Sequence, residues 1–242
     1  MISEVRPQAV VFDLDGLMFN SEDLYDRVSE QLLGRRGRSL TPELKRKMMG
    51  VSELCSMQMM IDQHQFTDTA EALLEESDAI LDRLLPGDLA PMPGLMGLLD
   101  ALEFAGLAKA IATSSRRPFV TRVLDHFDLR PRFHFLLTAE DVTRAKPHPE
   151  IYRKAAARFA LAPRRILVLE DSENGCRAAT TAGAWTVAVP SHHTIDHEFS
   201  GVQLIADSLA DPRLYRALGL ASVHVEEPKI HETDYRHPGS SR

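Results

Sequence analysis

The chain has 242 residues, of which 44% are hydrophobic and 26% charged, and its formal net charge is −7. This composition is ordinary for a globular enzyme of one large or two modest domains, and the negative charge argues against a nucleic-acid partner. The two cysteines are far apart in the sequence, so we expect no disulfide bond. We see no signal peptide at the N-terminus and no apolar run long enough for a membrane span, so we expect a soluble, cytoplasmic protein.

Short apolar runs alternate with helical patterns along most of the chain. The first run, residues 8–12, predicts a buried strand. Further strands are expected at residues 108–112, 133–137, 165–169 and 185–189, with helices at residues 94–105, 118–127, 149–160 and 174–182. Such alternation forms right-handed crossovers. The pattern predicts an α/β fold, a doubly wound parallel sheet (Rossmann-like) with helices on both faces.

Residues 21–90 interrupt this alternation, because their apolar spacing is helical throughout. The stretch is too long for a single connection between a strand and a helix. We therefore expect an inserted, all-helical cap domain, with a return hinge at Pro86, Gly87, Pro91, Pro93 and Gly94. The expected units are a core of residues 1–20 and 91–221, a cap of residues 21–90 and a polar C-terminal tail of residues 222–242.

Polar side chains follow four of the predicted strands, at the sheet edge where open α/β folds bind ligands. In chain order they are Asp13 and Asp15, then Thr113 and Ser114, then Lys146, then Glu170 and Asp171. Two like charges about 4 Å apart cost roughly 4 kcal/mol at an effective dielectric near 20. A hard cation relieves such repulsion, and Mg²⁺ suits carboxylates combined with a substrate phosphate. The sequence therefore predicts a Mg²⁺ site, and the hydroxyls predict a phosphate cradle.

Four motifs in this order resemble the haloacid dehalogenase superfamily. They are DLDG at residues 13–16, the hydroxyl of Thr113, Lys146 within AKPHPEIY, and LEDSENG at residues 169–175. The position of the cap resembles the helical-cap subfamily, and the wider text FDLDGLMFNSE is similar to the β-phosphoglucomutase-like phosphatases. The resemblance implies a Mg²⁺-dependent phosphatase that acts on a small phosphorylated metabolite through an aspartyl phosphate. We expect it to act as a monomer.

The resemblance also implies a role for each of these residues. Asp13 is the expected nucleophile, and Asp15 is the expected general acid, whose backbone carbonyl also contacts the metal. Asp171 is the second expected metal ligand, with Glu170 as a ligand or an outer partner. The remaining expected contacts are Thr113 to the phosphoryl group, Lys146 to Asp13 and the developing charge, and Ser114 and Arg117 to the substrate phosphate.

Three functions remain open, namely a phosphatase, a sugar phosphomutase and a non-catalytic ligand-binding relative. A mutase needs basic groups in the cap, yet residues 21–90 hold 8 Lys/Arg and 14 Asp/Glu, a net charge of 8 − 14 = −6. Glu53 also follows Gly50-Val51-Ser52, where the family's mutases carry an arginine. Arg116 and Arg117 stay available for a second phosphate. These features favour hydrolysis.

Several other residues carry weaker signals. Asn20 stands where the family usually has an aspartate, and with Asp23 it is typical of a helix N-cap. Met18-Phe19 are expected at the substrate entrance, and substrate choice is expected to depend on Tyr25, Met49, Ser52 and Met57. Arg35, Arg36 and Arg38 and the run Lys45-Arg46-Lys47 indicate a solvated face. His192 and His193 resemble a metal-binding pair but lack a carboxylate at useful spacing, so no second metal site is expected.

Overall fold

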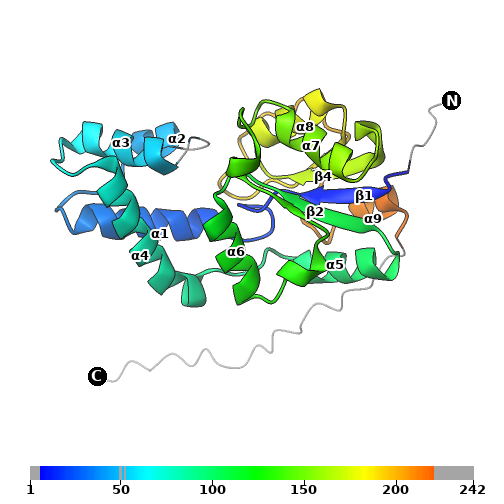
Figure 1. Ribbon diagram of the computed structural model, residues 1–242, viewed down its shortest axis with the longest axis horizontal. Helices are drawn as coiled ribbons and strands as arrows, with labels where there is room; N and C mark the ends of the chain where they lie inside the picture. The colour runs from blue at the N-terminus through cyan, green and yellow to red at the C-terminus, as the bar shows by residue number, and fades with distance from the viewer. Residues whose placement is uncertain (1–5, 49–50, 52, 221–242) are drawn as a thin grey trace, which may run out of the picture.

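A parallel six-stranded sheet in the order β3-β2-β1-β4-β5-β6 organises the computed structural model, which describes residues 6–48, 51 and 53–220 (Figure 1). The strands are β1 (Ala9–Phe12), β2 (Ala108–Ala112), β3 (Leu136–Leu137), β4 (Ile166–Glu170), β5 (Trp185–Ala188) and β6 (Leu204–Ile205). The helices of the core are α5 (Leu95–Phe104), α6 (Arg117–His126), α7 (Glu150–Arg158), α8 (Glu173–Ala182) and α9 (Pro212–Leu218). Short 3-10 turns are η1 (Arg130–Arg132), η2 (Ala139–Asp141) and η3 (Pro163–Arg165). The predicted doubly wound α/β fold is confirmed.

Alternate residues of β1 face opposite sides of the sheet, as the pleat requires. Val10 and Phe12 pack in the cluster that contains α5, α6 and α9, whereas Ala9 and Val11 pack in the cluster that contains α7 and α8. All four side chains are fully buried. Two layers of helices therefore cover the sheet, which explains why its central strands are apolar without interruption.

The order of the strands reverses at β1, which lies between β2 and β4. Phe12 is level with Ile111 of β2 and with Leu169 of β4, so these three neighbouring strands end close to the same line. The residues that follow them therefore meet at one edge of the sheet, at the reversal point where ligands of such folds bind.

In the described part of the chain, four helices follow β1 and lie to one side of the sheet as a cap (Figure 1). They are α1 (Ser21–Gly34), α2 (Pro42–Met48), α3 (Glu53–His64) and α4 (Ala70–Asp88). Leu24, Leu32 and Leu73 are fully buried among them. Burial of a leucine side chain contributes about 1.5–3 kcal/mol, so the apolar stripes of the sequence account for the packing of the cap.

The connections between cap and core differ from the prediction. Pro86 and Gly87 are not hinge residues, because α4 continues to Asp88 while its apolar stripe stays buried at Leu81 and Leu85. Asn20 does not cap α1 through its side chain. Its Oδ1 instead accepts a hydrogen bond of 2.6 Å from the Ala90 amide, and its Nδ2 donates to the Asp88 carbonyl. The side chain of Asn20 thus ties the two connections together.

The C-terminal part of the sheet was harder to predict. Within the predicted strand 133–137 only Leu136–Leu137 forms β3, although the His134 amide still donates to the Lys109 carbonyl. β6 and α9 were not predicted, because β6 has two half-buried or exposed residues and shows no apolar run. The expected tail of residues 222–242 lies outside the described residues. In the part of the chain that the structure describes, no helix is both long and apolar enough to span a membrane.

Candidate active site

The ends of β1, β2 and β4 bring the predicted polar residues together. The Asp13 amide donates to the Leu169 carbonyl, and the Thr113 amide donates to the Leu137 carbonyl, so both residues continue the ladder one step beyond their strands. The side chains of Asp13, Thr113 and Asp171 are almost entirely buried. Three loops that are far apart in the sequence thus converge on one polar centre.

Lys146 lies at the middle of this centre. Its ammonium donates to Asp13 Oδ1 at 2.5 Å, to Glu170 Oε1 at 2.6 Å and to the Ala112 carbonyl at 3.0 Å. These three bonds use every proton of the ammonium. Its side chain is only 7% exposed, so the ion pairs are shielded from water. Burial disfavours the ammonium, but the carboxylates of Asp13 and Glu170 outweigh it and raise the pKa of Lys146.

Glu170 is the last residue of β4 and lies beneath the centre, 1% exposed. Its Oε1 also accepts a hydrogen bond from the Tyr152 hydroxyl, and its Oε2 accepts one from Ser172 Oγ at 3.2 Å. Both oxygens are therefore occupied by donors, and Glu170 does not line the cavity described below. Of the two predicted roles for Glu170, a metal ligand or an outer partner, this position fits the outer partner.

Gly175 in α8 has a specific spatial reason to be glycine. A Cβ at this position would lie 2.0 Å from three atoms of the Glu170 carboxylate group. We therefore expect Gly175→Ala to displace Glu170 and, with it, Lys146. The expected result is a loss of activity of at least about tenfold and a loss of stability of about 1–3 kcal/mol, measured by turnover and urea unfolding.

A matched control is Gly97→Ala in α5, because the nearest atom to its added Cβ, the Tyr215 hydroxyl, is at 3.7 Å. This substitution should keep full activity and stabilise the helix by up to about 1 kcal/mol. Equal behaviour of the two variants would contradict the proposed packing of Gly175 on Glu170.

Asp15 lies beside the centre and accepts hydrogen bonds from two hydroxyl groups of the loop that follows β2 (residues 113–116, the β2 loop). Asp15 Oδ2 accepts hydrogen bonds from Ser115 Oγ at 2.5 Å and from Thr113 Oγ1 at 3.2 Å. Its other oxygen, Oδ1, is buried and has no hydrogen-bond partner among the described residues. The next residue, Gly16, has a φ of +71° and turns the backbone directly after Asp15. A Cβ at Gly16 would lie 2.4 Å from Asp171 Oδ2. The glycine therefore allows the first and fourth loops to approach each other.

The carboxyl groups of the centre are under electrostatic strain. Burial raises the pKa of Asp13 to about 8, and Glu170 and Asp15 add to this effect although Lys146 opposes it. Burial, followed by the charges of Glu170 and Asp13, raises the pKa of Asp171 well above its usual range. One oxygen from each of Asp13, Glu170 and Asp171 lies within 4.8 Å of the other two. One ammonium does not balance these three acids, so the cluster fits a hard cation.

A cavity of about 300 Å³ opens above this centre. The core contributes six of the predicted residues to its lining, namely Asp13, Asp15, Thr113, Ser114, Lys146 and Asp171. Glu22 of α1 and Arg46 of α2 line it from the cap. The other lining residues are Ser172, Glu173, Asn174, Gly175, Thr194 and His197.

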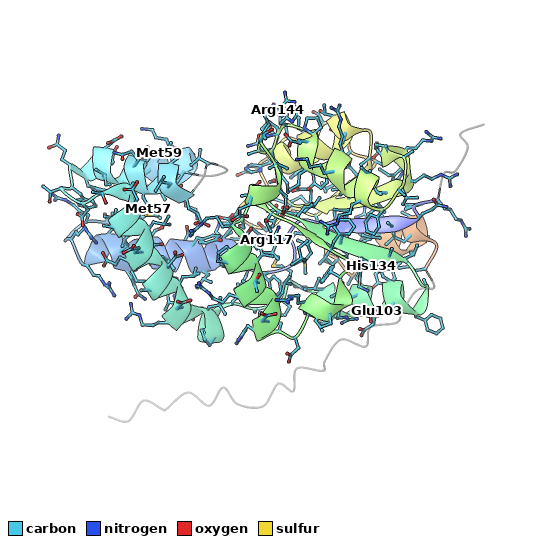
Figure 2. All side chains as sticks on the ribbon, in the orientation of Figure 1. Met57, Met59, Glu103, Arg117, His134 and Arg144 are labelled. Atoms are coloured by element: carbon cyan, nitrogen blue, oxygen red, sulfur yellow. The ribbon has the colours of Figure 1, made fainter. Side chains whose placement is uncertain are left out.

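Within the described ranges, the cap residues at the cavity differ from those that the sequence indicated. Tyr25 and Met57 do not line it; the Tyr25 ring contacts Phe119, and Met57 packs inside the cap on α3 (Figure 2). Met49 and Ser52 lie outside the described residues. Met18-Phe19 are fully buried rather than at an entrance. Arg46 is 73% exposed, as its assignment to a solvated face predicted, and it also borders the cavity, which nothing in the spacing of the sequence shows.

The two arginines next to the β2 loop are occupied by other partners. Arg117 is at the start of α6 (Figure 2) and forms an ion pair of 2.5 Å with Asp141, so it does not line the cavity. Arg116 forms ion pairs with two cap residues, Glu53 of α3 and Asp78 of α4. The structure therefore does not place Arg117 in the predicted phosphate contact, and it commits Arg116 to closing the cap onto the core.

Together these features define a class of protein, a capped α/β enzyme whose acidic centre lies at the carboxyl ends of a parallel sheet. The sequence profile described as haloacid dehalogenase-like hydrolase matches residues 10–189. The chain belongs to this family, and the resemblance inferred from its motifs is confirmed.

Named relatives agree with this assignment. (DL)-glycerol-3-phosphatase 1, mitochondrial, of Arabidopsis thaliana is 33% identical over 83% of this chain and 70% of its own length. Hexitol phosphatase B of Escherichia coli is 28% identical over 76% of this chain and 83% of its own. The crystal structure of a putative β-phosphoglucomutase from Thermotoga maritima superimposes with a TM-score of 0.72 at 25% identity, covering 88% and 97% of the two chains. The predicted enzyme class, a haloacid dehalogenase-like phosphatase, is confirmed.

Proposed function

We propose that the protein is a Mg²⁺-dependent phosphatase that hydrolyses a small phosphate monoester through a phosphorylated Asp13. The observation that carries this proposal is the position of the Lys146 ammonium, which bridges Asp13 and Glu170 directly beneath the cavity. A nucleophilic carboxylate needs to be held in one direction, and Lys146 holds one oxygen of Asp13 while the other remains for attack.

The side chains fit the cation that the family implies. Asp13, Asp171 and the backbone carbonyl of Asp15 would hold Mg²⁺, and Glu170 would orient Lys146 from below. Oxygen donors of this kind are the ones that Mg²⁺ prefers, and a cation would relieve the burial and mutual repulsion that raise the pKa values of Asp13 and Asp171. When bound, the cation would neutralise charge on the substrate phosphate and on the acids.

The residues themselves would carry the proton and the phosphoryl group. The free oxygen of Asp13 attacks phosphorus, the bond to the leaving oxygen breaks, and Asp15 donates a proton to that oxygen from the unpartnered Oδ1. Asp15 then takes a proton from a water molecule that attacks the aspartyl phosphate. Thr113 and Ser114 offer hydroxyls to the phosphoryl oxygens, and Lys146 neutralises the charge that develops on them.

The structure favours hydrolysis over the two alternative functions. A mutase must bind a second phosphate, yet Arg116 is already paired with Glu53 and Asp78, and Arg117 with Asp141. The cap contributes Arg46 to the cavity but also the acidic Glu22. A non-catalytic relative has no need of the buried, self-repelling acids. Action as a monomer and a cytoplasmic location stay predictions.

For the substrate we propose a phosphorylated polyol or sugar. Among the described residues, the cavity away from the strand ends is lined by polar side chains, which include Glu22, Arg46, Asn174 and His197, and by no aromatic ring other than that imidazole. Such walls suit hydroxyl groups and offer no platform for a nucleobase. The relatives named for glycerol phosphate and hexitol phosphate point in the same direction.

A panel of substrates assayed for phosphate release tests this proposal. Glycerol 3-phosphate and hexitol phosphates should have a kcat/KM at least about tenfold above that of phosphoglycolate or a nucleoside monophosphate, since each hydrogen bond to a charged group is worth about 1.5–3 kcal/mol. Conversion of β-glucose 1-phosphate to the 6-phosphate without net release of phosphate would instead support a mutase.

Glu22 supplies a prediction on pH. Burial raises the pKa of Glu22 to about 7, and the charges of Asp15 and Asp26 add to this effect. The carboxylate that accepts a substrate hydroxyl is therefore present above about pH 7 and is lost as the pH falls. We expect the ratio of kcat/KM for a polyol phosphate to that for p-nitrophenyl phosphate to fall about tenfold between pH 8 and pH 6.

The control is Glu22→Gln, whose amide does not titrate. In this variant the same ratio of kcat/KM values should be independent of pH. The reference substrate p-nitrophenyl phosphate has no hydroxyl on its leaving group, so its own pH dependence reports the titration of residues other than Glu22. A ratio that falls equally in both proteins would show that Glu22 does not contact the substrate.

A further inference from the structure

A second group of side chains with metal-ligating atoms lies outside the centre described above, next in sequence to residues that line the cavity. It consists of Asp23 in α1 of the cap and of His192 and His193 in the loop after β5 of the core. The sequence shows the two histidines, but their carboxylate partner comes from a position 170 residues away. The sequence spacing around the histidines therefore could not reveal this carboxylate, which only the fold brings close to them.

The distances within this group are close to those of a metal site. Asp23 Oδ1 lies 2.8 Å from His193 Nε2 and 3.2 Å from His192 Nε2. Ligand atoms about 2.0–2.1 Å from a tetrahedral Zn²⁺ are about 3.3 Å apart, so small side-chain movements would admit the ion. His192 is 69% exposed, which leaves the fourth position to water.

The histidine loop is held in place before any ion binds. The Ser191 amide donates to Thr194 Oγ1 at 3.0 Å, and the His193 amide donates to Ser191 Oγ at 3.3 Å. Thr194 lines the catalytic cavity, as does Glu22, the neighbour of Asp23. An ion bound here would therefore join the cap to the core beside the opening of the active site.

We propose that Asp23, His192 and His193 form a site for a transition-metal cation such as Zn²⁺, and that occupancy holds the cap against the core and slows turnover. Two imidazoles with one carboxylate favour Zn²⁺ over Mg²⁺, which prefers oxygen ligands only. Opening of a cap admits substrate and releases product, so a bond across the cleft lowers kcat.

Lys45 of α2 opposes binding and gives the proposal a sharp test. Its ammonium, which also pairs with Asp26, lies 3.2 Å from His193 Nδ1. An ammonium only donates, so Nδ1 accepts and the ring proton is on Nε2, facing Asp23. A cation bound to Nε2 requires the other tautomer of the neutral ring, in which the proton has moved from Nε2 to Nδ1 and faces the Lys45 ammonium. Removal of the ammonium should therefore strengthen binding.

The experiment is a titration of the full-length protein with Zn²⁺ in saturating Mg²⁺, by competition with a chromophoric chelator. The wild type should bind one equivalent, His192→Ala and His193→Ala should bind more than about tenfold more weakly, and Lys45→Met should bind more tightly. His126→Ala, which removes an exposed histidine at the end of α6, is the control and should match the wild type. Equal binding by His192→Ala and the wild type would overturn the site.

Turnover of p-nitrophenyl phosphate under the same conditions tests the effect on the cap. His192→Ala should keep the basal activity, because His192 does not line the catalytic cavity, and should lose the inhibition by Zn²⁺ that the wild type shows. Displacement of Mg²⁺ from the catalytic acids would inhibit both proteins equally, and that result would overturn the proposed control of the cap. These outcomes do not depend on the identity of the physiological substrate.

Discussion

Asp13→Asn should lower the turnover of p-nitrophenyl phosphate by at least about a thousandfold, with the fold retained. The amide lacks the negative charge that attacks phosphorus, so no aspartyl phosphate can form. Lys146 keeps its bonds to Glu170 and to the Ala112 carbonyl, which preserves the local structure. The amide oxygen of the asparagine can still accept the hydrogen bond from Lys146, and the loss of one carboxylate relieves the repulsion from Glu170 and Asp15, so the melting temperature should stay close to that of the wild type.

The matched control is Asp125→Asn on α6, since Asp125 is about half exposed and pairs only weakly with Arg130. It makes the same chemical change away from the cavity and should leave activity unaltered. Intact-mass measurement after rapid quenching should detect one added phosphoryl group on the wild type and none on Asp13→Asn. Retention of more than a few per cent of activity by Asp13→Asn, with normal thermal unfolding, would mean that another residue is the nucleophile.

Removal of divalent cations should have the second largest effect. We expect EDTA to lower kcat by at least about a hundredfold and added Mg²⁺ to restore it, because a cation in such a centre contributes several kcal/mol of charge stabilisation. Since burial and mutual repulsion raise the pKa values of Asp13 and Asp171, binding of Mg²⁺ should also release protons and raise the melting temperature of the protein.

The variant Asp171→Asn tests whether Mg²⁺ acts at this site or only through the ionic strength of the solution. The variant should need about 10–100-fold more Mg²⁺ for half-maximal activity, whereas Asp125→Asn should titrate as the wild type does. Full activity in the presence of a chelator, or identical Mg²⁺ titrations of the two variants, would contradict the assignment of Asp171 as a ligand.

Much of the fold could be read from local patterns. The apolar runs at β1, β2, β4 and β5 predicted their positions to within one or two residues, because strands buried on both faces need continuous apolar side chains. The helical stripes of residues 21–90 predicted the cap for a similar reason. The errors occurred where local preference was overruled by packing, as at Pro86 inside α4, or where an element has no apolar run, as at β6.

The polar centre was predictable because topology alone brings the ends of parallel strands to one edge. Asp13, Thr113, Lys146 and Asp171 could be grouped before any distance was known, since each follows a recognisable strand. The bonds within the group could not be predicted. That Tyr152 donates to Glu170, and that Glu170 lies under the cavity rather than in it, depends on how α7 packs against the sheet.

The amino-acid sequence by itself determined the order of the elements, the edge of the sheet at which the polar centre lies and the kinds of side chain present there. Only the tertiary structure decided which cap residues reach that edge: Glu22 and Arg46 at the cavity, Glu53 on Arg116, and Asp23 beside His192 and His193. The physical reason is that periodicity records which face of a helix is apolar and therefore buried. It does not record which polar group on the other face meets a partner brought near from elsewhere in the chain.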